Sequence, residues 1–205
     1  VDGPDTRKTL DFAIDHMGAL CVASNHGEHL IGAMTHPDEE MRTLIATSIW
    51  PRVHDRVVSS YGIYPNVATP GAALLLKERM EAAGHLQYLM QAPGYIEGDD
   101  FVVLHADVTN QPWEQQKKDL DDYIRTRMWN YEQSQMPYQL GEEVRNVVPE
   151  HLVQSGLTKT LVSGHFHRHT RELAPRTLQD GRHLLLATYL DDDFVVTYES
   201  HKRSM

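Results

Sequence analysis

Apolar residues along this chain follow two alternating patterns. Apolar positions spaced three or four residues apart predict helices over residues 6–17, 72–83 and 113–130, with a further helix within 141–154. An acidic turn at residues 37–40 predicts the start of a helical region that reaches about Ser60, and Pro51 is expected to kink or divide it. Short apolar runs predict strands over residues 20–23, 101–104, 157–163, 184–189 and 194–198.

This alternation of helices and strands predicts an α/β fold. A chain of 205 residues is long enough to bury one sizeable core. The sequence contains no internal repeat, linker or low-complexity stretch. We therefore expect a single domain over residues 1–205.

Polar clusters follow three of the predicted strands. Asn25-His26 comes after the first, His105-Ala-Asp107 after the second, and His165-Phe-His167 after the third. Ligand sites in layered α/β proteins gather at strand ends, where loops from distant parts of the sequence converge. Asn oxygen and His nitrogen atoms together suit borderline or hard divalent ions such as Mn, Fe, Ni or Zn. One histidine at a strand end is more often a hydrogen-bonded structural residue, but three such clusters favour a metal site.

The tetrapeptide Gly164-His165-Phe166-His167 is the most specific of these clusters. Histidines at i and i+2 can direct both rings toward one point from the end of a strand, and the preceding glycine allows a sharp turn. Neutral imidazole is the commonest protein metal ligand. The alternative is that two of the chain's 13 histidines coincide on a surface loop.

Net charge and cysteine content exclude several classes of function. A formal net charge of −10 argues against nonspecific binding to nucleic acid or to an anionic membrane, since both favour basic surfaces. Cys21 is the single cysteine, so no intrachain disulfide can form and a reducing cytoplasm is expected. No apolar run is long enough to span a membrane.

The order of the polar clusters resembles the calcineurin-like metallophosphoesterases. That family carries Asp-x-His, Gly-Asp-x-x-Asp-Arg-Gly, Gly-Asn-His-Glu or -Asp, a later His, and Gly-His-x-His in this order. The first residues, 1–6, are similar to the end of the second motif in the branch that contains diadenosine tetraphosphate hydrolases, phage protein phosphatases and bacterial polynucleotide phosphatases. The resemblance implies a layered β-sandwich flanked by helices, with helical insertions.

The chain also departs from this pattern. The Asp-x-His motif and the Gly-Asp that would precede Val1 are missing, no arginine separates Asp2 from Gly3, and Ser24 stands where the family has glycine. Either the chain omits the first residues and strands of a longer protein, or it is a naturally shortened domain with an incomplete metal centre. We favour the first, because a domain without its first core strands would leave a sheet edge and apolar surface uncovered.

The resemblance implies a metal centre with two divalent ions, with Mn preferred and Fe, Ni or Zn possible. Asn25, His105 and His165 would hold one ion, and His167 would reach the other. The reaction would be in-line hydrolysis of a phosphomonoester or phosphoanhydride by an activated water.

The resemblance assigns acid catalysis to His26 and Asp2. His26 would protonate the leaving oxygen, and Asp2 would hold its ring, since a carboxylate that accepts from one ring nitrogen fixes the tautomer. The alternative for Asp2 is an ordinary capping or turn residue. Two other functions stay open for the chain: an inactive, metal-binding relative with a regulatory or scaffold role, and a hydrolase with a single zinc.

Overall fold

The structure is a computed structural model, and it describes residues 5–49, 51–64, 69–127, 136–141, 147–165, 176–178 and 181–186. The chain divides into two compact units, Val1–Ala92 and Pro93–Met205.

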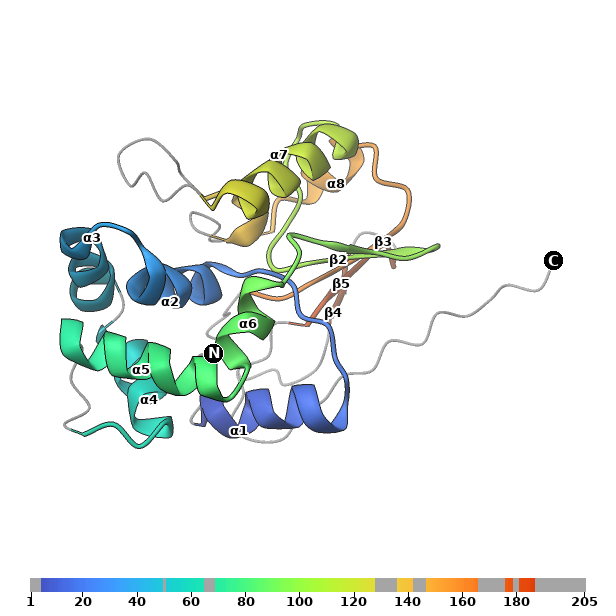
Figure 1. Cartoon of the computed structure of the whole chain (residues 1–205). Coiled ribbons are helices and arrows are strands. Elements are labelled where there is room, and N and C mark those ends of the chain that lie inside the picture. Colours follow the sequence, from blue (N-terminus) through green and yellow to red (C-terminus); the bar gives the residue numbers. More distant parts are fainter. Residues whose placement is uncertain are drawn as a thin grey trace. The chain divides into compact units, whose positions relative to one another are not determined.

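All regular secondary structure among the described residues of unit 1 is helical. Its α-helices are α1 Thr6–Asp11, α2 Asn25–Thr35, α3 Glu39–Leu44, α4 Pro51–Ser60, α5 Pro70–Ala82 and α6 His85–Met90 (Figure 1). Two π-helical turns, Phe12–His16 and Ile45–Ile49, extend α1 and α3. The predicted division at Pro51 is confirmed, because α4 begins at that proline. Proline is well tolerated there, since the first helical position needs no N–H donor.

The predicted strand at residues 20–23 is wrong. These residues adopt no regular structure, and Asn25-His26, expected to follow a strand, begins α2 with Ser24 as the N-cap. The Ser24 hydroxyl accepts a hydrogen bond from the Gly27 N–H at 3.1 Å and so caps the helix. A run of four apolar residues does not distinguish a strand from another buried segment, and the capping signal was the more informative feature.

The core of unit 1 is formed where α2, α4, α5 and α6 pack together. Ile31 and Met34 of α2, Val57 of α4 and Leu76 and Met80 of α5 are all almost completely buried in one hydrophobic cluster. Nearly every residue of α2 is buried, which places this helix at the centre of the unit.

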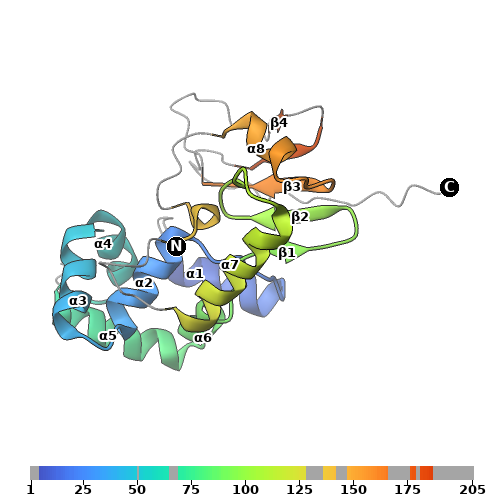
Figure 2. The ribbon, with the colours of Figure 1, turned by 90° about the horizontal axis from the view of Figure 1, so that it is seen from above.

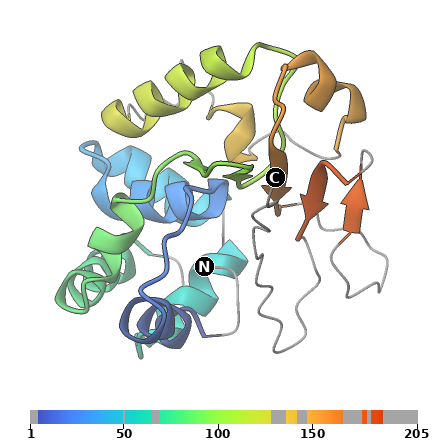
Figure 3. The same ribbon diagram turned by 90° about the vertical axis from the view of Figure 1, so that its right-hand side faces the viewer.

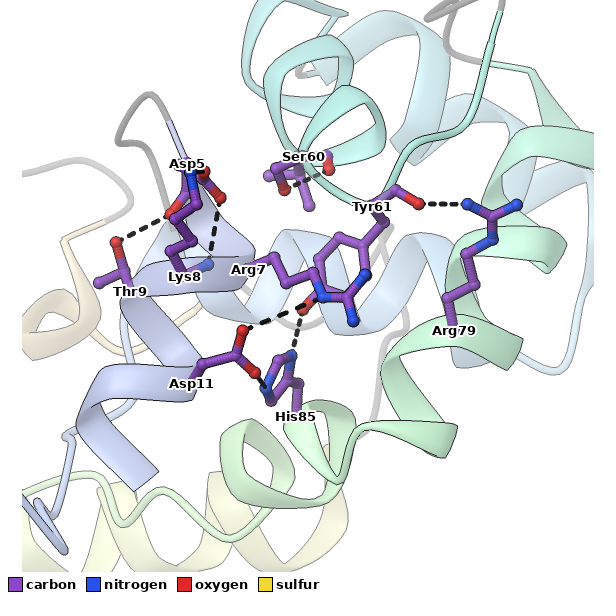
Figure 4. Close-up of polar contacts among 10 residues, drawn as sticks. Asp5, Arg7, Lys8, Thr9, Asp11, Ser60, Tyr61, Arg79 and His85 are labelled. Atoms are coloured by element: carbon purple, nitrogen blue, oxygen red, sulfur yellow. Dashed lines mark hydrogen bonds and ion pairs between the residues drawn. The ribbon is translucent and has the colours of Figure 1, made fainter. Parts of the chain in front are cut away.

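A polar network is embedded in the same core (Figure 4). The Tyr61 hydroxyl lies 2.5 Å from Nδ1 of His85, and Nε2 of His85 lies 3.0 Å from Oδ1 of Asp11. Tyr61 and His85 are each 1% exposed. Burial raises the pKa of Tyr61, so the phenol stays protonated and donates to the imidazole. The three side chains join α1, the end of α4 and α6.

Unit 2 contains one open mixed sheet. Its strands are β1 Ile96–Glu97, β2 Phe101–Leu104, β3 Thr160–Ser163, β4 Arg176–Leu178 and β5 His183–Leu185. They lie in the order β1-β2-β3-β5-β4, with β2, β3 and β5 parallel and both edge strands antiparallel (Figure 2 labels β1 to β4). The predicted α/β class is confirmed. The second sheet that a β-sandwich needs is not found among the described residues, and the predicted strand at 194–198 lies outside them.

Two helices of unit 2 lie on the same side of this sheet (Figures 1 and 3). They are α7 Trp113–Thr126 and α8 Pro149–Gln154, and the 3₁₀ turn Tyr138–Leu140 comes between them in sequence. Leu120 of α7 and Leu161 of β3 are completely buried. Among the residues with a described conformation, no helix is long and apolar enough to cross a bilayer.

Candidate functional site

The parallel pairing of β2 and β3 brings His105 and His165 together. Leu104 and Ser163 are partners in the register, so both strands end at the same edge of the sheet. Nδ1 of His165 lies 3.1 Å from Nε2 of His105, and the two ring centroids are 4.9 Å apart with an interplanar angle of 73°. The Gly164 N–H also donates to the His105 carbonyl oxygen at 2.9 Å, which joins the two strand ends beyond the ladder itself.

His165 adopts a left-handed backbone conformation, with a φ of +67°. This conformation is unfavourable for a residue other than glycine and costs on the order of 1 kcal/mol or more. The Gly164–His105 hydrogen bond and the packing of the ring hold it in place. Such strain is found most often at functional sites, because the surrounding structure must enforce it.

The separation of the two ring nitrogens fits a shared cation. Two imidazole nitrogens that bind one ion at about 2.0–2.1 Å, with an angle between them of about 90–110°, lie about 2.9–3.4 Å apart. The 3.1 Å separation of His105 Nε2 and His165 Nδ1 falls within this range. It also fits a hydrogen bond in which one neutral ring donates its N–H to the other. The donor set therefore suits two positions on a divalent ion.

No group of three or more His, Cys, Asp or Glu side chains that could hold a metal occurs among the residues that the structure describes.

Asp107, the nearest acidic residue in sequence to His105, binds backbone N–H groups. Its carboxylate is 1% exposed and accepts from the backbone N–H groups of Val108 at 2.8 Å and Val148 at 3.1 Å. Burial raises the pKa of Asp107, although these two hydrogen bonds oppose the effect. Asp107 therefore fastens the loop after β2 to the segment before α8.

Asn25 and His26 form the first turn of α2 in unit 1. The Asn25 side chain is buried, and its Oδ1 accepts from the His26 N–H at 3.0 Å. This pair belongs to unit 1, whereas the His105–His165 pair belongs to unit 2. Of the other candidate residues, Asp2 and His167 lie outside the described part of the chain.

His183 is a buried residue of this sheet that sequence reasoning missed. It lies on β5, is 1% exposed, and its Nε2 is 2.8 Å from the Ser163 hydroxyl at the end of β3. Its Nδ1 has no hydrogen-bond partner within the described structure. Burial lowers the pKa of His183 to about 4, so the ring is neutral at physiological pH. Its position at the start of an apolar run was the only signal in the sequence.

No family model, no curated protein and no solved structure matches this chain.

Proposed function

We propose that the protein is a metal-dependent phosphoesterase that hydrolyses a phosphomonoester or a phosphoanhydride. The observation that carries the proposal is the pair of ring nitrogens of His105 and His165, 3.1 Å apart at the ends of adjacent parallel strands. The ordered motifs of the sequence support the same function. A layered β-sandwich of the calcineurin-like type and a reducing cytoplasm are parts of this proposal.

The motif resemblance assigns Asn25, His105 and His165 to one divalent ion and His167 to a second, and the contact that supports this assignment is the one between His105 Nε2 and His165 Nδ1. Two divalent ions, Mn by preference, would supply charge neutralisation for a phosphoryl group and acidify a water molecule. The two histidines must stay neutral to offer their lone pairs. Their positions just after β2 and β3 keep the two ring nitrogens 3.1 Å apart.

His26 is the proposed general acid, with Asp2 as the carboxylate that orients its ring. A histidine near its ordinary pKa of about 6.5 can donate a proton at neutral pH. His26 occupies the first turn of an eleven-residue helix, α2, where the helix dipole favours a negatively charged phosphoryl group. The proposed substrate is a phosphorylated small molecule, nucleotide or protein. A net charge of −10 argues against nonspecific nucleic-acid binding.

The proposal is tested by separating metal content from turnover. The Mn²⁺-loaded protein is assayed with p-nitrophenyl phosphate, and bound metal is measured by mass spectrometry. We expect His105→Ala and His165→Ala to lose metal and activity together, whereas His26→Ala keeps its metal and loses most turnover. His16→Ala is the matched control, because His16 is an exposed histidine.

Three results would contradict this function. An absence of turnover in the metal-loaded protein would favour an inactive, metal-binding relative. One tightly bound zinc per chain would favour a mononuclear hydrolase. Loss of metal in His26→Ala would show that His26 is a ligand and that its role as general acid is wrong.

A further inference from the structure

The ring of His165 is held against a turn that leaves no room for a side chain. A Cβ atom at Gly141 would lie 2.7 Å from Nδ1 and 2.8 Å from Cε1 of the His165 ring. Separations below about 3 Å do not occur between unbonded heavy atoms of this kind without displacement, since protein interiors are close-packed. Gly141 also has a φ of +89°, which glycine adopts without cost. The ring of His165 therefore occupies the space that a larger residue would fill.

The turn that carries Gly141 is anchored by two hydrogen bonds of Gln139, one from its backbone and one from its side chain. The Ala106 N–H, next to His105, donates to the Gln139 carbonyl oxygen at 3.0 Å. The Gln139 side-chain amide donates to Oε1 of Gln116 at 2.5 Å. Gln116 is 1% exposed and Gln139 is 4% exposed. The backbone of this turn is thus fixed relative to the end of β2, which carries His105. Gly141 of the same turn contacts the ring of His165.

Both polar atoms of the Gln116 side chain form hydrogen bonds within the loop before α7 as well. Its Oε1 accepts from the Thr109 N–H at 2.9 Å, and its Nε2 donates to the carbonyl oxygens of Gln111 at 2.6 Å and Thr109 at 3.2 Å. A buried amide network in which every member has partners is rigid, because each broken bond would leave an unsatisfied polar atom. This network ties α7 to the Tyr138–Leu140 turn.

We infer that Gly141 and the buried Gln116–Gln139 amide pair are positioning residues for the His105–His165 pair. They fix the ring of His165 where its Nδ1 meets Nε2 of His105. This inference rests on the proposed function where it concerns metal binding. The contact between the turn and the ring is independent of that function, so the two can fail separately.

The first test compares two glycine variants. Gly141→Ala places a methyl group against His165, whereas Gly156→Ala is the matched control, because Gly156 has a φ of +69° and no heavy atom within 4 Å of its Cβ position. Both variants place an alanine in the left-handed backbone conformation, so both lose stability for that reason. We expect Gly141→Ala to lower Mn²⁺ affinity, measured by titration calorimetry, about 10- to 100-fold, and Gly156→Ala to leave it unchanged. Equal affinities in the two variants would overturn the inference.

The second test needs no metal. Thermal midpoints are measured for Gly141→Ala, for His165→Ala and for the double variant. We expect the shift caused by Gly141→Ala to be larger in the wild-type background than in the His165→Ala background, where it should fall to the shift of Gly156→Ala. Equal shifts in both backgrounds would overturn the inference. Coupling in this cycle without metal binding by the wild-type protein would instead overturn the proposed function alone.

The third test removes the amide link. Gln139→Leu deletes the hydrogen bond to Gln116, and Gln115→Leu makes the same substitution at an exposed position of α7. We expect Gln139→Leu to weaken Mn²⁺ binding and Gln115→Leu to leave it unaltered. Full affinity in Gln139→Leu would exclude the amide pair from the positioning role.

Discussion

The buried His183 should make unit 2 sensitive to mild acid. Its pKa is lowered from 6.5 to about 4 by burial, so the unfolded chain binds a proton at a higher pH than the folded chain does. Stability is therefore full above about pH 6.5 and is lost as the pH falls from 6.5 toward 4. The difference between the pKa values of His183 in the unfolded and folded chain corresponds to about 3 kcal/mol of the free energy of unfolding. About 2 kcal/mol of this is lost by pH 5.

The perturbation that isolates this effect is His183→Gln. The glutamine amide can keep the hydrogen bond to the Ser163 hydroxyl, but it does not titrate. The free energy of unfolding is measured by urea denaturation at pH 7 and pH 5. We expect the wild-type protein to lose about 2 kcal/mol more than the variant over this interval. His16→Gln, a substitution at an exposed histidine, should keep the wild-type dependence on pH.

Parallel pH dependence in the wild-type protein and in His183→Gln would refute this reasoning. It would mean that the imidazole is charged in the folded sheet or that water reaches its second nitrogen. Because other groups of the protein also titrate in this range, only the difference between the two proteins tests the argument.

Three further substitutions test the fold. Tyr61→Phe should lower the free energy of unfolding by about 1–3 kcal/mol, because it removes the donor to the buried imidazole beside it, while Tyr64→Phe, at a residue 76% exposed, should have little effect. Ser24→Ala should cost about 1 kcal/mol by removing the cap of α2, and circular dichroism at rising urea concentration measures the loss. Leu161→Ala, at a fully buried position of β3, should lower the free energy of unfolding by about 2–5 kcal/mol. The control is Leu74→Ala, at a residue 50% exposed, and a thermal midpoint of Leu161→Ala no lower than that of this control would contradict the prediction.

The convergence of His105 and His165 could be predicted from the sequence alone. Each follows an apolar run, and the ends of parallel strands meet at one edge of a sheet. The strand predicted before Asn25 was wrong, because an apolar run of four residues is too short to identify a strand. Ser24 followed by the acidic Glu28 was a local signal for a helix start, and α2 does begin directly after Ser24.

Other parts of the site depend on contacts between residues far apart in sequence, and no local pattern reveals them. Gly141 lies 24 residues before His165, and only the folded chain shows that it contacts the ring. The burial of His183 likewise depends on its pairing beside β3. Local patterns predict elements, whereas a ring's neighbours are set by packing between elements.

The parallel pairing of β2 and β3 also determines when the histidine pair can form during folding. The two strands are separated by residues 105–159, which include α7 and α8. Closing so long a connection has an entropic cost that must be met before the strands stabilise each other, so pairings of this kind form slowly. α7 can form from local contacts within its own sequence, but the two rings meet only when the non-local ladder closes. The candidate site should therefore be among the last features of unit 2 to appear in refolding, and among the first lost in unfolding that begins at this edge of the sheet.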